Sequence, residues 1–162
     1  MVRDRPPNRR HPIDQLARSH ERLREQLAAL AALGNAADVN FDVLDGLVAW
    51  FEGPGARHEA DEEESLFPRL RIAAPDDGTR ALLDRLAAEH RIHTGLHAEL
   101  ASARTAPEVA RLAVEMERAY RTHLDLEERD LFPKARSLLG APDFEAISAE
   151  MEARRGRGGA KP

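Results

Sequence analysis

Two stretches of the chain share a pattern of residue types that can bind metal ions. The first begins at His58 and the second at His123, and both read His-x-x-x-Glu-Glu-x-x-Leu-Phe-Pro followed by a basic residue. On a helix, residues four positions apart lie on one face, so the imidazole and the first glutamate can bind one ion. Imidazole and carboxylate donors without thiolate suit iron, manganese, zinc or copper.

Further histidines fall on the apolar faces of the predicted helices. His20 continues the stripe of Leu16, Leu23, Leu27 and Leu30. His90, His93 and His97 fall within about 60° of arc on one later helix. In an antiparallel pair, residues equally far from the connecting turn lie at the same depth in the bundle. Compared in this way with the two motifs, His90 ranks first as a ligand, His93 second and His97 third. Of the seven histidines, only His11 is expected to lie off an inward face.

Each of these residues also has an ordinary explanation. A single buried histidine is more often a hydrogen-bonded core residue, and a run such as Glu62–Glu64 usually faces solvent. Burying the whole set without a cation would leave many unpaired polar groups, each costing about 1–3 kcal/mol. The sequence therefore predicts a metal site in the core, with the ligands His20, His58, Glu62, His90, His123 and Glu127.

Several neighbouring residues have more than one interpretation. His93, His97 and Tyr120 are expected to be ordinary core residues, and Tyr120 could also donate to a ligand. Glu63 and Glu128 are expected in solvent or hydrogen-bonded to the ligands. The Leu-Phe pairs of the two motifs, Leu66-Phe67 and Leu131-Phe132, are expected in the core at the end of the bundle. The proline after each pair is expected to bend the helix.

The elements that must position these residues are helices. Apolar periodicity and capping residues predict helices over 12–33, from Asn40 through Leu70, from Thr79 past Leu100, from Pro107 to about 139, and over 143–154. A kink or short break is expected at Gly53-Pro54-Gly55, and a turn over 75–78. This arrangement predicts an all-α, antiparallel up-down four-helix bundle with a short fifth helix. Residues 1–11 and 154–162 are expected to be disordered basic segments around a domain over 12–153.

Composition excludes several classes of protein. The chain has 162 residues, of which 42% are hydrophobic and 33% charged, enough for one domain. It has no cysteine, which excludes disulfides, thiolate zinc sites, iron–sulfur clusters and cysteine nucleophiles. We expect no membrane association, because no apolar run approaches about 20 residues. The formal net charge of −5 argues against nucleic acid, and without a signal-like segment the expected location is the cytoplasm.

The doubled motif, together with His20 and the Glu89-His90 pair, resembles the hemerythrin-like HHE cation-binding domains over about residues 12–139. The resemblance implies a non-haem di-iron centre in a four-helix bundle, completed by an oxo or hydroxo bridge. It implies that Glu62 and Glu127 bridge the irons. His20 and His58 would then bind one iron, and His90 and His123 the other.

The chain departs from the oxygen-carrying members of that family. Those proteins have two histidines four positions apart on the third helix, whereas Leu86 precedes His90 here. They also have an aspartate five residues after the fourth-helix histidine, whereas Glu127 follows His123 by four. Glu59, Glu89 or His93 could complete the site. These departures favour peroxide chemistry, nitric oxide binding or iron sensing over reversible oxygen carriage.

Three functions are therefore compared. The leading hypothesis is a di-iron protein that binds or senses O2, NO, peroxide or iron itself. The alternative is a di-iron enzyme with catalase- or peroxidase-like activity in oxidative or nitrosative stress defence. A third is a structural bundle with zinc or no metal. The resemblance also includes iron-centre repair proteins, but those carry a cysteine-bearing segment that is missing here. The expected partner is a diatomic ligand or peroxide, and the sequence identifies no protein partner.

Overall fold

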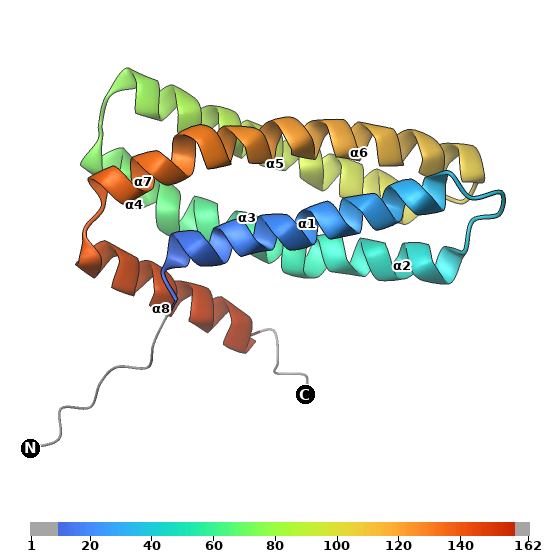
Figure 1. The fold of residues 1–162 in the computed structure, drawn as a ribbon, viewed down its shortest axis with the longest axis horizontal. Helices are drawn as coiled ribbons and strands as arrows, with labels where there is room; N and C mark the ends of the chain where they lie inside the picture. The colour runs from blue at the N-terminus through green and yellow to red at the C-terminus, as the bar shows by residue number, and fades with distance from the viewer. Residues whose placement is uncertain (1–9, 158–162) are drawn as a thin grey trace, which may run out of the picture.

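The computed structural model describes residues 10–157 and consists of helices joined by short connections (Figure 1). Four long helical rods, over residues 12–34, 41–73, 77–102 and 106–138, lie side by side, and the last helix packs across one end of them. The helices are α1 (Pro12–Gly34), α2 (Phe41–Trp50), α3 (Ala56–Asp61), α4 (Phe67–Ala73), α5 (Asp77–Ser102), α6 (Ala106–Leu126), α7 (Phe132–Leu138) and α8 (Ala141–Arg157), and the π-helical turns are η1 (Phe51–Gly55), η2 (Glu62–Leu66) and η3 (Glu127–Leu131). The predicted all-α bundle with a fifth helix is confirmed.

Side-chain caps determine where the helices begin. Asn40 accepts from the backbone of Asp42 and Val43 at the start of α2. Thr105 and Glu108 form a reciprocal capping box at the start of α6. Asp76 caps α5 by accepting from Thr79 N. The predicted turn over 75–78 was therefore too long, because Asp77 and Gly78 already belong to α5.

The short break, one of the two alternatives expected at Gly53-Pro54-Gly55, is wrong, because the chain stays helical from Phe41 to Ala73 and forms a π-helical turn there. The other two π turns directly precede the Phe-Pro pairs of the doubled motif. There the N–H of Phe67 bonds the carbonyl of Glu62, five residues back, and Phe132 bonds Glu127 in the same way. A proline has no N–H and clashes with the carbonyl four residues back, and a wider turn accommodates it without ending the helix.

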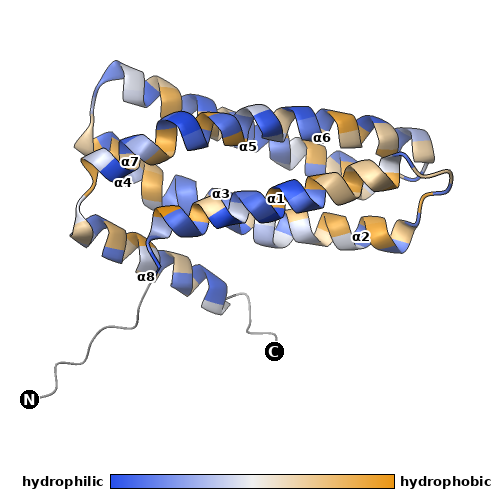
Figure 2. Cartoon of the chain, viewed as in Figure 1, coloured by the Kyte–Doolittle hydropathy of each residue, from blue (hydrophilic) through white to orange (hydrophobic). Residues whose placement is uncertain are grey.

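The apolar core is divided into two clusters. One contains the C-terminal half of α1, α2, and the facing parts of α5 and α6. The other contains the start of α1 with α4, α7, α8 and the first half of α5. Figure 2 shows α2 and the C-terminal half of α1 as a hydrophobic region at one end of the bundle. Between the clusters lies a polar layer, which contains His20 on α1 and His90 on α5.

Helix α8 is held against the bundle by ion pairs to a buried carboxylate. Asp61 is fully buried and accepts from Arg154 and Arg155, each at 2.8 Å. Arg154 also donates to Ser65 at 2.7 Å, and Ile147 and Met151 complete the apolar contact. Residues 154–157 are thus helical, in contrast to the expected disordered tail that began at 154. Residues 1–9 and 158–162 lie outside the described part of the chain.

Within residues 10–157, none of the helices is long and apolar enough to cross a membrane.

Replacing Arg154 with alanine should lower the free energy of unfolding of the metal-free protein by about 1–3 kcal/mol, because the buried Asp61 and Ser65 then lose a donor. Chemical denaturation measures the change. The control is Arg129→Ala, whose ion pair with Asp130 is exposed on both sides and should contribute less than about 0.5 kcal/mol. Equal losses in the two variants would contradict this assignment.

Candidate metal centre

Six buried side chains from all four rods meet in the polar layer. His20 comes from α1, His58 from α3, His90 from α5 and His123 from α6, while Glu62 and Glu127 begin η2 and η3. Their exposed fractions are between 0% and 3%. They form two overlapping groups, one of His20, His58, Glu62 and Glu127 and the other of Glu62, His90, His123 and Glu127, and in each the donor atoms lie within 4.8 Å of one another. The structure thus brings together all six predicted ligands.

The two glutamates are shared between the groups, and each directs one oxygen to each group. Glu127 Oε2 lies 3.0 Å from His20 Nε2, and its Oε1 lies 3.0 Å from His123 Nε2. Glu62 Oε1 lies 3.5 Å from His58 Nε2, and its Oε2 lies 3.4 Å from His90 Nε2. A carboxylate in this position can bridge two cations, as in the dimetal sites of helix bundles.

Most of the donor atoms have no hydrogen bond. Both oxygens of Glu62 and Glu127, His20 Nε2 and both ring nitrogens of His58 are buried without a hydrogen-bond partner. His20 Nε2 and Glu127 Oε2 face each other at 3.0 Å without hydrogen-bond geometry. Leaving this many polar atoms unpaired is costly. Two bound cations would satisfy the orphaned oxygens and the facing nitrogens, so the residues fit a dimetal centre.

Three of the four histidines in the layer are oriented by outer carboxylates. The Nδ1 contacts are His20 to Glu128 at 2.9 Å, His90 to Glu63 at 2.7 Å and His123 to Glu89 at 2.8 Å. An Nδ1–H donated to a carboxylate leaves Nε2 free to face the centre and raises its basicity as a ligand. Glu63 and Glu128 thus bind ligand histidines, one of the two roles expected for them.

The phenylalanines of the doubled motif pack on these histidines as well. Phe67 stacks on His90 with ring centroids 6.1 Å apart and an angle of 7°, and Phe132 stacks on His20 at 5.1 Å and 29°. Each motif therefore supplies a glutamate to the centre and, five residues later, an apolar wall. The spacing indicated only that these rings belong to the core, since the stacking partners lie on other helices.

Glu59, His93, His97 and Tyr120 lie beside the centre but outside both groups. His93 Nδ1 donates to Glu59 at 2.9 Å, and His97 Nε2 lies 2.8 Å from the Tyr120 hydroxyl. Glu89, considered as a ligand, instead accepts from His123. Among the three α5 histidines, only His90 belongs to a candidate group. Sequence periodicity placed these side chains inward but could not identify their partners on other helices.

In the metal-free protein, protons balance part of the charge of the layer. Burial and the neighbouring charge of Glu127 raise the pKa of Glu62 to about 8. Burial lowers the pKa of His90, but the carboxylate of Glu62, 3.4 Å from His90 Nε2, outweighs this effect and raises the pKa to about 10. Burial is likewise outweighed at His123, where the charge of Glu127 raises the pKa to about 9. The pKa of Glu127 stays well below its ordinary value, because His123 and His20 outweigh its burial.

Cation binding should therefore release protons and strengthen as pH rises. At pH 7, pKa values of about 10, 9 and 8 keep His90, His123 and Glu62 protonated, and a cation must displace those protons. The apparent affinity for Zn²⁺, a redox-silent probe, should rise about tenfold per pH unit for each proton released. Titration calorimetry in buffers of different ionisation enthalpy counts the protons. Binding without proton release would contradict the protonated state of the layer.

The comparisons with known proteins agree with the geometry of the centre. No curated protein matches the chain. Residues 11–153 match the family model described as Hemerythrin HHE cation binding domain, a span that contains every residue of both groups and most of α8. The resemblance inferred from the doubled motif is thereby confirmed. The chain belongs to the hemerythrin HHE cation binding domain family.

Proposed function

We propose that the chain is a non-haem di-iron protein that binds a small oxidising molecule at its bundle-core centre. Glu62 and Glu127 bridge the two irons, His20 and His58 bind one, and His90 and His123 bind the other. The observation that carries this proposal is the position of the two shared carboxylates, each with one oxygen toward either histidine pair.

The donor set is compatible with a pair of iron ions. The groups contain imidazole and carboxylate only, which iron, manganese, zinc and copper all accept. Carboxylate-bridged pairs built from the facing helices of a bundle are typical of di-iron and di-manganese sites. Two adjacent irons would supply redox chemistry and open positions for a small ligand. The chain's own residues hold the ring orientations, through Glu63, Glu89 and Glu128, and exclude water through the apolar clusters on both sides.

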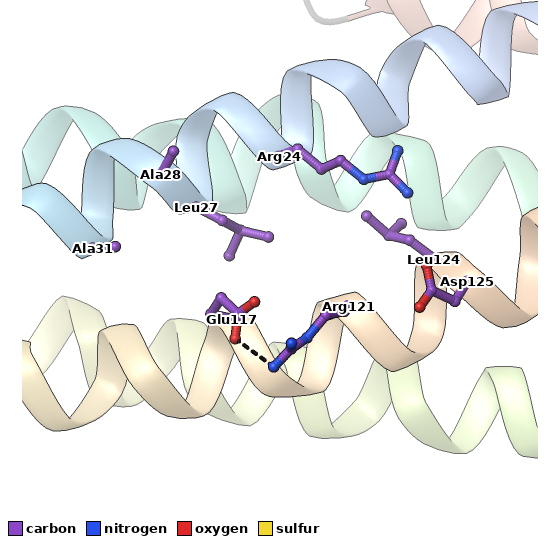
Figure 3. Close-up of a pocket in the computed structure, with 8 residues that line it drawn as sticks. All are labelled: Arg24, Leu27, Ala28, Ala31, Glu117, Arg121, Leu124 and Asp125. Atoms are coloured by element: carbon purple, nitrogen blue, oxygen red, sulfur yellow. Dashed lines mark hydrogen bonds and ion pairs between the residues drawn. The ribbon is translucent and has the colours of Figure 1, made fainter.

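The surroundings of the centre limit the size of the ligand. The layer is buried between two apolar clusters, so a diatomic molecule or peroxide is the class that can reach it. Two surface grooves approach its borders. One, of about 360 Å³ between α5 and α6, is lined by Glu89 and His93 among others. The second, of about 320 Å³ between α1 and α6, has Leu27 and Leu124 at its centre and Arg24 at its margin (Figure 3).

Peroxide turnover is the second candidate, and one observation favours it. One turn before His90 stands Leu86, which is fully buried in an apolar cluster and cannot bind a metal. Helix α5 thus gives a single histidine to the groups, and each ion would have two histidines and the two shared glutamates, with a position left for a small ligand. An open position suits the reduction or disproportionation of peroxide in oxidative or nitrosative stress.

The first experiment measures metals per chain on untagged protein by elemental mass spectrometry, with the ultraviolet–visible spectrum of the same sample. About two irons and near-ultraviolet bands of an oxo bridge support the proposal. Zinc alone, or no metal after anaerobic iron loading, overturns it. Oxygen binding that reverses under vacuum would identify a carrier, and catalytic loss of hydrogen peroxide would identify the enzyme.

Replacing either bridging glutamate should abolish two-iron loading. Glu62→Ala and Glu127→Ala each remove a ligand shared by both ions, so the iron content should fall from about two to one or fewer per chain. The control is Glu52→Ala, an exposed glutamate on the same helical rod as Glu62, which should keep both irons. Retention of two irons in either test variant would contradict the bridging roles.

Replacing His97 with alanine should leave the iron content unchanged. His97 Nε2 is directed to the Tyr120 hydroxyl, and His97 belongs to neither donor group. Elemental analysis of His97→Ala beside His90→Ala makes the comparison, since the second variant should lose iron. A loss of iron from His97→Ala would place a ligand deeper along α5 than the geometry indicates.

A further inference from the structure

Beside the centre, a phenol and an imidazole form a buried hydrogen-bonded pair. Tyr120 is the chain's one tyrosine and is 1% exposed. Its hydroxyl lies 2.8 Å from His97 Nε2. Burial raises the pKa of Tyr120 well above its ordinary value, so the phenol keeps its proton. Burial also lowers the pKa of His97 to about 4, so the neutral imidazole can accept the hydrogen bond at Nε2.

A line of aromatic rings joins this pair to the metal centre. The Tyr120 ring stacks on His93 with centroids 3.9 Å apart and an angle of 15°. The His93 ring meets His123, a ligand of the centre, edge to face at 4.8 Å. Only one imidazole therefore separates the phenol from the ligand.

The line continues from Tyr120 toward the surface. Phe51 stacks on His97 at 5.3 Å and lies 6.1 Å from Tyr120. Trp50, the chain's one tryptophan and partly exposed, meets Phe51 edge to face at 5.5 Å. The two most oxidisable aromatic side chains of the protein thus lie on one line that ends at the centre.

We propose that Tyr120 is a one-electron donor to the di-iron centre, with His97 as its proton acceptor. This inference rests on the proposed function, with peroxide as the oxidant. Hydrogen peroxide would take two electrons and two protons from water and leave as two water molecules. One electron would come from Tyr120 by way of His93 and His123, and the other from the bound irons. In the same step the phenolic O–H bond breaks and an N–H bond forms at His97 Nε2, which leaves a neutral tyrosyl radical and a protonated imidazole.

The pair fits this role because the proton moves only along an existing hydrogen bond. A buried phenol without an acceptor would have to keep its proton on oxidation and form a strongly acidic radical cation, whereas His97 Nε2 can take that proton and carry the charge as an imidazolium. Stability alone does not require the pair, because two apolar side chains of the same shape can be as stable as a buried polar pair.

The first test is electron paramagnetic resonance on iron-loaded protein frozen shortly after mixing with hydrogen peroxide. Because Tyr120 is the one tyrosine, ring-deuterated tyrosine labels this residue alone. We expect a radical whose hyperfine splitting collapses on deuteration. The signal should persist in Trp50→Phe and fall at least about tenfold in Tyr120→Phe, with the iron content unchanged. His97→Gln keeps a hydrogen-bond acceptor but cannot take the proton, and it should lower the yield as well.

The outcomes separate this inference from the proposed function. Peroxide consumption without a deuterium-sensitive radical overturns the role of Tyr120 and leaves the di-iron proposal standing. Failure to load iron or to react with peroxide overturns the peroxide chemistry and the donor role with it.

The second test needs no metal and addresses the phenol–imidazole pair itself. In pulse radiolysis of the metal-free protein, a one-electron oxidant such as the azide radical oxidises the partly exposed Trp50. The tryptophan radical should then decay as the tyrosyl radical of Tyr120 forms, at a rate independent of protein concentration. That transfer should be lost in Tyr120→Phe and slowed in His97→Gln. A tryptophan radical that decays equally in all three proteins overturns the inference.

Discussion

The structure depends on balancing the charge of one buried layer. Glu62 and Glu127 share a region between two apolar clusters, where water cannot solvate them. Protons on the neighbouring histidines or bound cations must compensate for them. The outer carboxylates orient the histidine rings, and arginines at the surface hold two of those carboxylates: Arg24 binds Glu128 at 2.8 Å and Arg85 binds Glu89 at 2.9 Å. His20 and His123 are thus each oriented by a carboxylate that is itself bound by an arginine at the surface.

The repeated motif gives the centre an approximate symmetry that the outer contacts break. His58 and His123 occupy matching positions, and each stands four residues before its glutamate. His123 Nδ1 has Glu89 as a partner, whereas both ring nitrogens of His58 lack one. Glu59, which follows His58, contacts His93 instead. The orientation of His58 therefore relies more on packing than that of the other three histidines, and the two donor groups are not equivalent.

Most of the fold and the six candidate metal ligands could be predicted from the sequence, because both depend on spacing along single helices. The four-residue spacing of His58 and Glu62 places them on one face of a helix, and apolar periodicity orients that face. Partners on other helices carry no such signal. The burial of Asp61 depends on where α8 docks, and the pairing of His97 with Tyr120 depends on the relative depth of α5 and α6. The sequence Gly53-Pro54-Gly55 favours a break, but Phe51 and Leu47 just before it are packed in the core. The chain there forms a wider, π-helical turn and remains helical.

The π turns have a consequence for how this sequence can change. A π turn holds one residue more than the α-helical turn it replaces, as an insertion in a helix would produce. Losing one residue between Glu62 and Phe67 would turn η2 into an ordinary α-helical turn, so the helices on both sides could keep their register. The clash between Pro68 and the preceding turn would then return. In lineages of this domain, a shortened η2 or η3 should therefore be found together with another residue in place of the proline that follows it.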